Sequence, residues 1–379
     1  MSQELLPVDL DAFWRDDELA HRDNCFYAES PQVALGIRMS DECVYAELDE
    51  PGDPWNPEPL PRRVELNKRY NDKAEQIVGR RLLPEKFPPR DAAFPPIRRI
   101  GEVFGGTYER RPQTGEWLSS PIDTPAQLED MLDRVDRLDL RAFMLPDEWE
   151  AEKKRIAETH GRKPRPLRSV RGPVTLATSI YGNENLIFLY YDAPELFQRF
   201  AETIQRVILE MANIMDVEAG YDPEHHPAPP GFAFADDECA MLTPEMYEVF
   251  GYPTLKAVFE HFSPNPGDAR YQHSDSAMGH IVPILGRLDL TGCNFGPTVL
   301  VDEIRRHMPH TRIDGCLAPF TFMRNQQDDI IAEVKRDCEM IKASGTKGLN
   351  LNTAGSINNG SSLASMRSVM WAIQEYGRY

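Results

Sequence analysis

The chain has 379 residues and a formal net charge of −19, from 61 acidic and 42 basic residues. This negative excess argues against a nucleic acid, an anionic membrane surface or a polyanionic substrate as its partner. Hydrophobic residues make up 41% and charged residues 27%, the ordinary composition of a globular protein. The sequence has no apolar run near the ~20 residues of a membrane span and no signal-peptide core. Six scattered cysteines without a CxxC pair fit a reducing compartment, so we expect a cytoplasmic protein.

The first 90 residues have the composition of an irregular extension. A proline-rich run, Pro51 to Pro57, interrupts any regular pattern, while Trp14, Phe26 and Trp55 are large apolar groups that favour packing on the rest of the protein. We therefore divide the chain into an extension over residues 1–90 and a main domain over residues 91–379. Helical spacing predicts a helix over 62–81, and the stretch 97–107 predicts a strand that ends in two glycines.

From residue 167 onward, predicted strands and helices alternate along the chain. Strands are predicted over 167–170, 231–235, 269–272, 290–295, 312–317 and 348–352, and helices over 194–219, 244–261, 278–288, 299–307, 326–344 and 362–376. This alternation is typical of parallel βα units in an α/β protein. Because no Gly-x-Gly-x-x-Gly fingerprint follows an early strand, we favour a (β/α)8 TIM barrel over an open sheet. The N-terminal third then supplies the two missing strands.

Polar residues concentrate just after the predicted strands, at the edge where barrel enzymes bind their ligands. We assign catalytic, substrate-binding and metal-binding roles to the residues at these ends. The candidate catalytic residues are Asp236, Asp237, Tyr181 and Arg324; the candidate substrate-binding residues are Asn183, Asn294, Asn352 and Ser356; the candidate metal ligands are His273, Asp275 and His280.

Two of these clusters carry most of the chemistry. Crowding within the acidic trio Asp236-Asp237-Glu238 favours a raised pKa or a bound cation, although one of these residues can equally cap the helix that begins near Thr243. His273 and Asp275 offer an imidazole nitrogen and a carboxylate oxygen, which suit Zn²⁺, Mn²⁺ or Fe²⁺. The alternative is a structural, hydrogen-bonded histidine.

The remaining polar segments are compatible with more than one role. The glycine-rich turn 352–360 can receive an anion at the start of the last helix, or serve only as a turn. Arg324 can pair with a substrate carboxylate or lie on the surface. Cysteines within or near strands favour buried, inert thiols. The absence of a Gly-x-Ser-x-Gly motif disfavours a serine hydrolase.

Several motifs together resemble the uroporphyrinogen decarboxylase superfamily, which includes the decarboxylase itself and zinc methyltransferases that move a methyl group to or from a corrinoid. The resemblance covers about residues 167–376. It rests on Gly172-Pro173-Val174-Thr175-Leu176-Ala177, Asn183-Glu184-Asn185-Leu186, Asp236-Asp237 followed by Leu242-Thr243-Pro244-Glu245-Met246-Tyr247, and His273-Ser274-Asp275. It implies a (β/α)8 barrel with its pocket at the strand ends.

The sequence departs from the superfamily in two places. It lacks the arginine-rich N-terminal segment with which the decarboxylase holds substrate carboxylates. The methyltransferases have a His-x-Cys pair and a later cysteine as zinc ligands, whereas this chain has Asp275 at the first cysteine position and the second falls near Gly355. A carboxylate in place of a thiolate makes a metal site harder and more suited to oxygen substrates.

These features predict a metal-assisted C1 transfer, most simply demethylation of a small oxygenated substrate, with a divalent metal, zinc foremost, and a corrinoid or corrinoid protein as methyl partner. A cofactor-free decarboxylase is the alternative, in which Asp236 stabilises a protonated ring intermediate and Arg171 or Arg324 holds a carboxylate. A barrel that binds a small molecule without chemistry is the third interpretation. Homodimers are common in the superfamily, so a homodimer is a further expectation.

Overall fold

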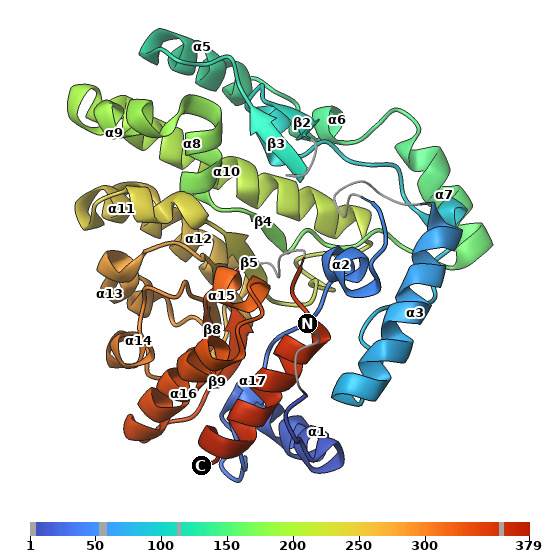
Figure 1. The fold of residues 1–379 in the computed structure, drawn as a ribbon. Coiled ribbons are helices and arrows are strands. Elements are labelled where there is room, and N and C mark those ends of the chain that lie inside the picture. The colour runs from blue at the N-terminus through green and yellow to red at the C-terminus, as the bar shows by residue number, and fades with distance from the viewer. Residues whose placement is uncertain (1–4, 53–58, 112–114, 356–359) are drawn as a thin grey trace. The chain divides into compact units, whose positions relative to one another are not determined.

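The computed structural model describes residues 5–52, 59–111, 115–355 and 360–379. Within these ranges seven strands form one sheet in the order β1-β9-β8-β7-β6-β5-β4, and β2 and β3, both labelled in Figure 1, form a separate pair. The strands are β1 (Ala34–Leu35), β2 (Thr107–Arg111), β3 (Gly115–Ser119), β4 (Ser169–Arg171), β5 (Phe232–Ala235), β6 (Arg270–His273), β7 (Gly292–Asn294), β8 (Arg312–Leu317) and β9 (Leu349–Thr353).

Helices fill most of the chain between the strands, as the predicted βα alternation requires. They are α1 (Leu10–Ala20), α2 (Val44–Leu48), α3 (Leu60–Val78), α4 (Ile100–Val103), α5 (Pro125–Asp136), α6 (Leu140–Met144), α7 (Trp149–His160), α8 (Pro173–Tyr181), α9 (Asn183–Asp192), α10 (Pro194–Glu218), α11 (Pro244–Phe250), α12 (Tyr252–Phe262), α13 (Val282–Leu285), α14 (Val301–His307), α15 (Pro319–Met323), α16 (Gln327–Ala343) and α17 (Leu363–Tyr376). No helix in the described ranges is both long and apolar enough to cross a bilayer.

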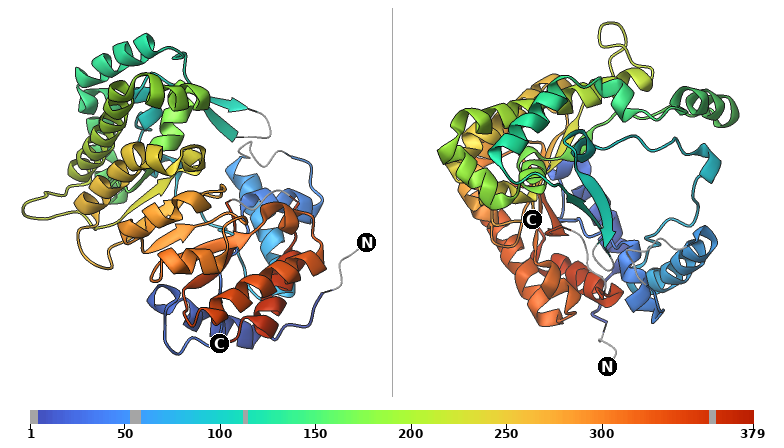
Figure 2. Two further views of the ribbon diagram at one scale, coloured as in Figure 1. Left: turned by 90° about the vertical axis from the view of Figure 1, so that its left-hand side faces the viewer. Right: turned by 90° about the horizontal axis from the view of Figure 1, so that it is seen from above.

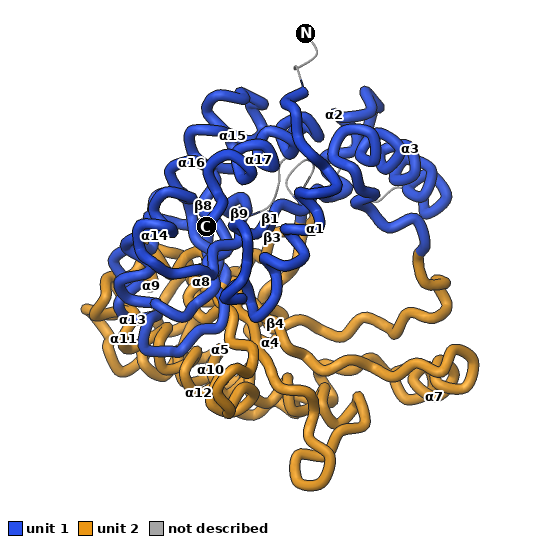
Figure 3. The backbone as a smooth tube through the Cα atoms, turned by 90° about the horizontal axis from the view of Figure 1, so that it is seen from below, with its two compact units in different colours: residues 1–86, 111–115, 273–379 blue, residues 87–110, 116–272 orange. Residues whose placement is uncertain are grey.

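The chain divides into two compact units, each made from segments that are distant in sequence (Figure 3). Unit 1 combines residues 1–86, 111–115 and 273–379, and unit 2 combines residues 87–110 and 116–272. In unit 1, β8 pairs with both β7 and β9 in parallel, with a five-residue register from Ile313↔Leu349 to Leu317↔Thr353 between β8 and β9. In unit 2, Ser169 to Arg171 pair with Ala233 to Ala235.

Unit 1 is built around the two ends of the chain. Strand β1 pairs with β9, with Ala34 opposite Asn350 and Leu35 opposite Leu351, although it lies in the segment that the sequence marks as irregular. Asp17 of α1 accepts a hydrogen bond from the Leu35 N–H at 2.8 Å and so ties the helix to the strand. The red C-terminal helix α17 accordingly lies beside the blue N-terminal segment in both views (Figures 1 and 2).

Unit 2 is centred on the long helix α10. Its bounds confirm the helix predicted over 194–219, and its apolar face is fully buried at Phe197, Phe200, Ile204 and Ile208. Proline at its first position is compatible with a helix start because the first N–H groups lack intrahelical partners. The helix therefore supplies one continuous apolar face to the core of this unit.

The strand predicted over 97–107 is wrong. Residues Ile100–Val103 form α4, and the strand β2 begins only at Thr107. The helix starts where Glu102 accepts from the Arg99 N–H at 2.7 Å, a capping contact between near neighbours that the apolar pattern does not reveal. Gly105, at φ +82°, then turns the chain out of the helix and toward β2.

Candidate metal centre and the strand ends around it

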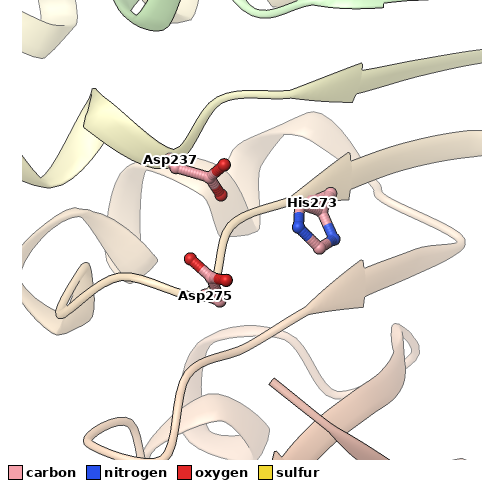
Figure 4. Close-up of side chains that lie close together, drawn as sticks. All are labelled: Asp237, His273 and Asp275. Carbon is pink, nitrogen blue, oxygen red and sulfur yellow. The ribbon is translucent and has the colours of Figure 1, made fainter. Parts of the chain in front are cut away.

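Three of the predicted site residues come together after adjacent strands. Asp237 follows β5, His273 is the last residue of β6, and Asp275 lies two residues further on. One candidate ligand atom from each side chain lies within 4.8 Å of the other two, and the three side chains face one another (Figure 4). Parallel strands that are neighbours in a sheet present their carboxyl ends at the same edge, which explains the approach.

The donor set of this cluster fits a divalent metal. One imidazole nitrogen and two carboxylate oxygens are the ligand types that suit Zn²⁺, Mn²⁺ or Fe²⁺. Three protein ligands also leave a position for substrate, as catalytic zinc sites do. Asp237 and His273 are half-buried and Asp275 is exposed, so the cluster remains accessible. His280 is exposed on the following 3₁₀ turn and lies outside this group.

The backbone around Asp275 leaves little room for another side chain. A Cβ on Gly355 would lie 2.2 Å from Asp275 Oδ2, and a Cβ on Gly296 would lie 2.3 Å from the Asp275 carbonyl oxygen. Gly355 also has φ +74°, where a residue with a side chain is strained. The resemblance places the second family cysteine near residue 355. In this chain the carboxylate of Asp275 occupies the space next to that position.

Asp236 is set apart from its neighbour Asp237 by complete burial. Its Oδ1 accepts from the Thr175 N–H at 2.7 Å, in the first turn of α8, and its Oδ2 has no hydrogen-bond partner among the described residues. Burial raises the pKa of Asp236 to about 7, against the lowering effect of Thr175, and the charges of Glu238 and Asp237 add less. The predicted pKa shift therefore has desolvation rather than crowding as its main cause.

Gly172 and Thr175, which the sequence analysis named only as parts of a motif, hold Asp236 in place. Gly172 lies so close that a Cβ there would be 2.2 Å from the Asp236 Cβ. Thr175 donates its N–H to Asp236, and its Oγ1 accepts from the Glu238 N–H at 3.0 Å. Thr175 thus fixes the residues on both sides of Asp237. In the sequence, the only indication of this role was the Gly-Pro-x-Thr motif. The role itself follows from the contact between Thr175 and Asp236 in the structure.

The predicted polar residues of unit 2 outside this cluster differ in exposure. Tyr181 is buried at the end of α8, where burial raises its pKa and Asp123 adds to the effect. Asn183 is exposed at the start of α9. Thr243 caps α11 with its own hydroxyl, which accepts from the Met246 N–H at 3.3 Å, so no member of the acidic trio is needed as that cap.

In unit 1, the predicted substrate-binding amides already have intramolecular contacts. Asn294 is buried on β7 and donates through Nδ2 to the Asp314 carbonyl oxygen at 2.8 Å. Asn352 is half-buried, and its Oδ1 accepts from the Thr353 N–H at 2.9 Å. Arg324 is exposed after α15. Ser356 lies outside the described residues.

The last helix and the cysteines answer two further expectations. Ser362 caps α17, since its hydroxyl accepts from the Ser365 N–H at 3.1 Å, and this contact reduces the need for an external anion there. Residues 356–359 of the turn 352–360 that precedes it lie outside the described residues. All six cysteines are buried, which confirms the burial predicted for those within or near strands, and burial raises the pKa of Cys43 to about 11.

The fold and the polar strand ends define an α/β protein of the TIM-barrel type, which confirms the predicted class. The chain belongs to the uroporphyrinogen decarboxylase (URO-D) family, whose model matches residues 73–376. No curated protein matches the chain in sequence. Within the described residues the sheet contains seven strands, with β1 and β4 at the ends of the strand order.

Solved structures similar to the chain include three with related names. A methyltransferase from Methanosarcina mazei matches with a TM-score of 0.55 at 16% identity, over 95% of this chain and 98% of that chain, and this likeness supports the fold. A putative vitamin-B12 independent methionine synthase from Listeria monocytogenes has a TM-score of 0.39 at 14% identity, over 90% and 95% of the two chains. A B12-independent methionine synthase from Shewanella sp. W3-18-1 has a TM-score of 0.33 at 10% identity, over 59% and 66%.

Proposed function

We propose that this chain is an enzyme of the URO-D family that transfers a methyl group from a small oxygenated substrate with the help of a bound divalent metal. The proposal rests on one observation: Asp237, His273 and Asp275 each have a candidate ligand atom within 4.8 Å of those of the other two. The name of the Methanosarcina mazei structure, a methyltransferase, supports the same class of reaction. Zinc is the first choice of metal, and a corrinoid or corrinoid protein is the first choice of methyl acceptor.

The residues present suit an oxygen substrate better than a thiol. A cation at this site would polarise a methoxy oxygen and stabilise the negative charge that develops there. Two carboxylates and one neutral imidazole balance the charge of a divalent ion, so the site can accept a neutral substrate without a counter-charge. As the methyl group passes to the acceptor, a nucleophilic atom of the acceptor supplies the electron pair of the new bond to the methyl carbon. The carbon–oxygen bond breaks, and the oxygen keeps its electron pair and takes up a proton from solvent. Thr175 and Asp236 act as positioning residues because they fix the backbone on both sides of Asp237.

Metal analysis of variants tests the proposal. Protein purified without added metal is compared with His273→Ala and Asp275→Ala by elemental analysis and by metal titration. Each substitution removes one of three ligands and is expected to weaken metal binding by at least about tenfold. His280→Ala is the matched control, because this exposed histidine lies outside the cluster. Unchanged metal affinity in His273→Ala and Asp275→Ala, or full turnover by metal-free protein, would contradict the proposal.

A cofactor-free decarboxylase is a second candidate, favoured by one observation. Asp236 is fully buried, has a pKa of about 7 and keeps one oxygen unpaired among the described residues, properties that suit an acid which stabilises or protonates an intermediate. Arg171 on β4 pairs with Ala235, the residue before Asp236, and its Nη1 donates to Ser179 Oγ at 3.4 Å. Release of CO2 from a carboxylated ring substrate, undiminished by a chelator, would favour this reaction over methyl transfer.

The cytoplasmic location and the homodimer expected from the sequence remain predictions. So does the third interpretation, binding without chemistry, which would give ligand-induced stabilisation and no product by mass spectrometry.

A further inference from the structure

A polar cavity of about 370 Å³ lies within unit 1, and one of its lining residues, Gly355, is next to the candidate metal ligand Asp275. Its walls come from the segment after β1, from β8 and from β9. It reaches Gly355, whose α-carbon lies against the carboxylate of Asp275. A molecule bound in this cavity would therefore approach a residue that the proposed function assigns to the metal.

The charges that line this cavity are balanced. Arg312 donates to both carboxylate oxygens of Asp314, each at 2.8 Å, so the Asp314 carboxylate neutralises its positive charge. Arg38 and Glu42 are the other two charged residues of the lining, one of each sign. A cavity with no net positive charge is poorly suited to a polycarboxylate, in contrast to the arginine-rich carboxylate sites that the resemblance would suggest.

Asn350 presents a hydrogen-bond acceptor without a partner. Its Nδ2 donates to Asp314 Oδ1 at 2.8 Å, and because a carboxylate only accepts, this contact fixes the orientation of the amide. The remaining oxygen, Oδ1, is buried and has no partner among the described residues. It lies over Gly36, where a Cβ would be 2.7 Å away, so only glycine at that position leaves the oxygen undisturbed.

Glu42 supplies a second such acceptor. Its Oε2 is buried with no hydrogen-bond partner in the described part of the chain. Burial raises the pKa of Glu42, and the neighbouring Asp41 adds to the effect. A buried polar atom that lacks a partner is costly, and the two residues that carry these atoms both line the cavity, so a ligand that reaches them would complete their hydrogen bonds.

We propose that this cavity binds the substrate of the methyl transfer through hydroxyl or amino groups that donate to Asn350 Oδ1 and Glu42 Oε2. The inference rests on the proposed function for its identification of the ligand as substrate. The substrate class is then a small methylated polyol or amino compound, with its methyl-bearing oxygen toward Asp275.

Calorimetric titration of metal-free protein tests this inference with four probes. Methyl glucoside and 2-methoxyethylamine carry the expected donors, 4-methoxybenzoate carries a carboxylate instead, and anisole carries neither. At least one of the first two is expected to bind about tenfold or more tightly than the last two. Equal binding of all four, or binding of 4-methoxybenzoate alone, would overturn the inference.

Substitution at the acceptors identifies the site. Glu42→Met removes the unpaired oxygen while keeping the length of the side chain, so it is expected to weaken the donor probe about tenfold and to raise the melting temperature. Gly36→Ala, which crowds Asn350 Oδ1, is a second variant with the same expected loss of binding. Glu129→Met on the exposed face of α5 is the matched control and should change neither property.

The outcomes separate this inference from the proposed function. If Glu42→Met and Gly36→Ala fold and bind the donor probe as tightly as the parent protein, the cavity is not its site and the inference fails, whatever the metal content. If the protein binds no metal but the probe binding depends on Glu42, the donor-binding cavity stands while the metal-assisted methyl transfer fails.

Discussion

Two buried carboxyl groups have opposite pKa shifts in this protein, and their hydrogen-bond partners explain the difference. Asp236 has one backbone donor, from Thr175, and burial raises its pKa to about 7. Burial would also raise the pKa of Glu218, but hydrogen bonds from Lys153, Trp149 and Arg141 outweigh it and lower the value to about 2. Burial alone therefore does not decide which acid is charged at neutral pH.

Glu218→Gln tests this account at the residue scale. Glu218 accepts from Lys153 at 2.5 Å, Arg141 at 2.6 Å and Trp149 at 2.8 Å, so its charge is stabilising in the folded state. Because its folded pKa lies below the usual 4.5, the stabilisation is present above pH 4.5 and is lost as the pH falls toward 2. We expect the substitution to lower the free energy of unfolding by roughly 2–4 kcal/mol at pH 7, measured by urea denaturation.

The pH dependence provides the internal check. The difference between Glu218→Gln and the parent protein should shrink as the pH falls toward 2, since a growing fraction of Glu218 is then protonated and neutral like the glutamine. Glu150→Gln is the matched control, because Glu150 contacts the same Arg141 and Lys153 but its side chain is 62% exposed. It should change the free energy of unfolding by less than about 1 kcal/mol. Equal effects of the two substitutions would show that burial of Glu218 contributes nothing.

At the scale of a single element, α10 shows how one amphipathic helix organises unit 2. Phe200 is fully buried, with ring centroids 6.2 Å from Phe104 and 5.7 Å from Phe250, in edge-to-face geometry. These contacts join α10 to segments before and after it in the chain. The exposed face of the same helix carries Val217, which is 59% exposed.

Phe200→Ala is expected to lower the free energy of unfolding by about 3–5 kcal/mol, because it removes a buried ring and leaves a cavity that the helix cannot fill. Val217→Ala on the same helix should cost less than about 0.5 kcal/mol. Chemical denaturation followed by circular dichroism measures both. A small loss for Phe200→Ala would mean that the unit repacks around the deleted ring.

The whole molecule depends on joining its two chain ends. Arg367 of α17 donates to the backbone carbonyls of Leu6 and Ile77, and Arg378 pairs with Asp16 at 2.9 Å. Together with the pairing of β1 and β9, these contacts place residues before 73 inside the core of unit 1. The family match begins only at residue 73, so it leaves this part of the core out.

A chain that starts at residue 73 is therefore expected not to fold. It lacks β1 and α1, leaves β9 without one of its neighbours and exposes the apolar surface that α1 covers. Loss of near-ultraviolet circular dichroism and of cooperative unfolding is the expected result. Addition of a separate fragment of residues 1–72 should restore part of the signal. Cooperative unfolding of the shortened chain alone would contradict this expectation.

Much of the secondary structure was predictable from local sequence. The strand over residues 312–317 and the helix α10 follow from patterns that neighbouring residues carry by themselves. Strand β1 was not predicted, because two residues are too few to show a period and its stability comes from pairing with β9. The same limit explains α4, where a capping contact outweighed an apolar pattern.

The candidate site divides in the same way. His273 and Asp275 lie in one turn, so their sequence alone gave the ligand types and their spacing, and with them the expectation of a metal. Only the strand order brings Asp237 to that pair, and only the fold leaves Asn350 and Glu42 unpaired in one cavity. Local periodicity is determined by residues a few positions apart, whereas a site depends on which distant segments pack together, and that is decided by the free energy of burying the whole core.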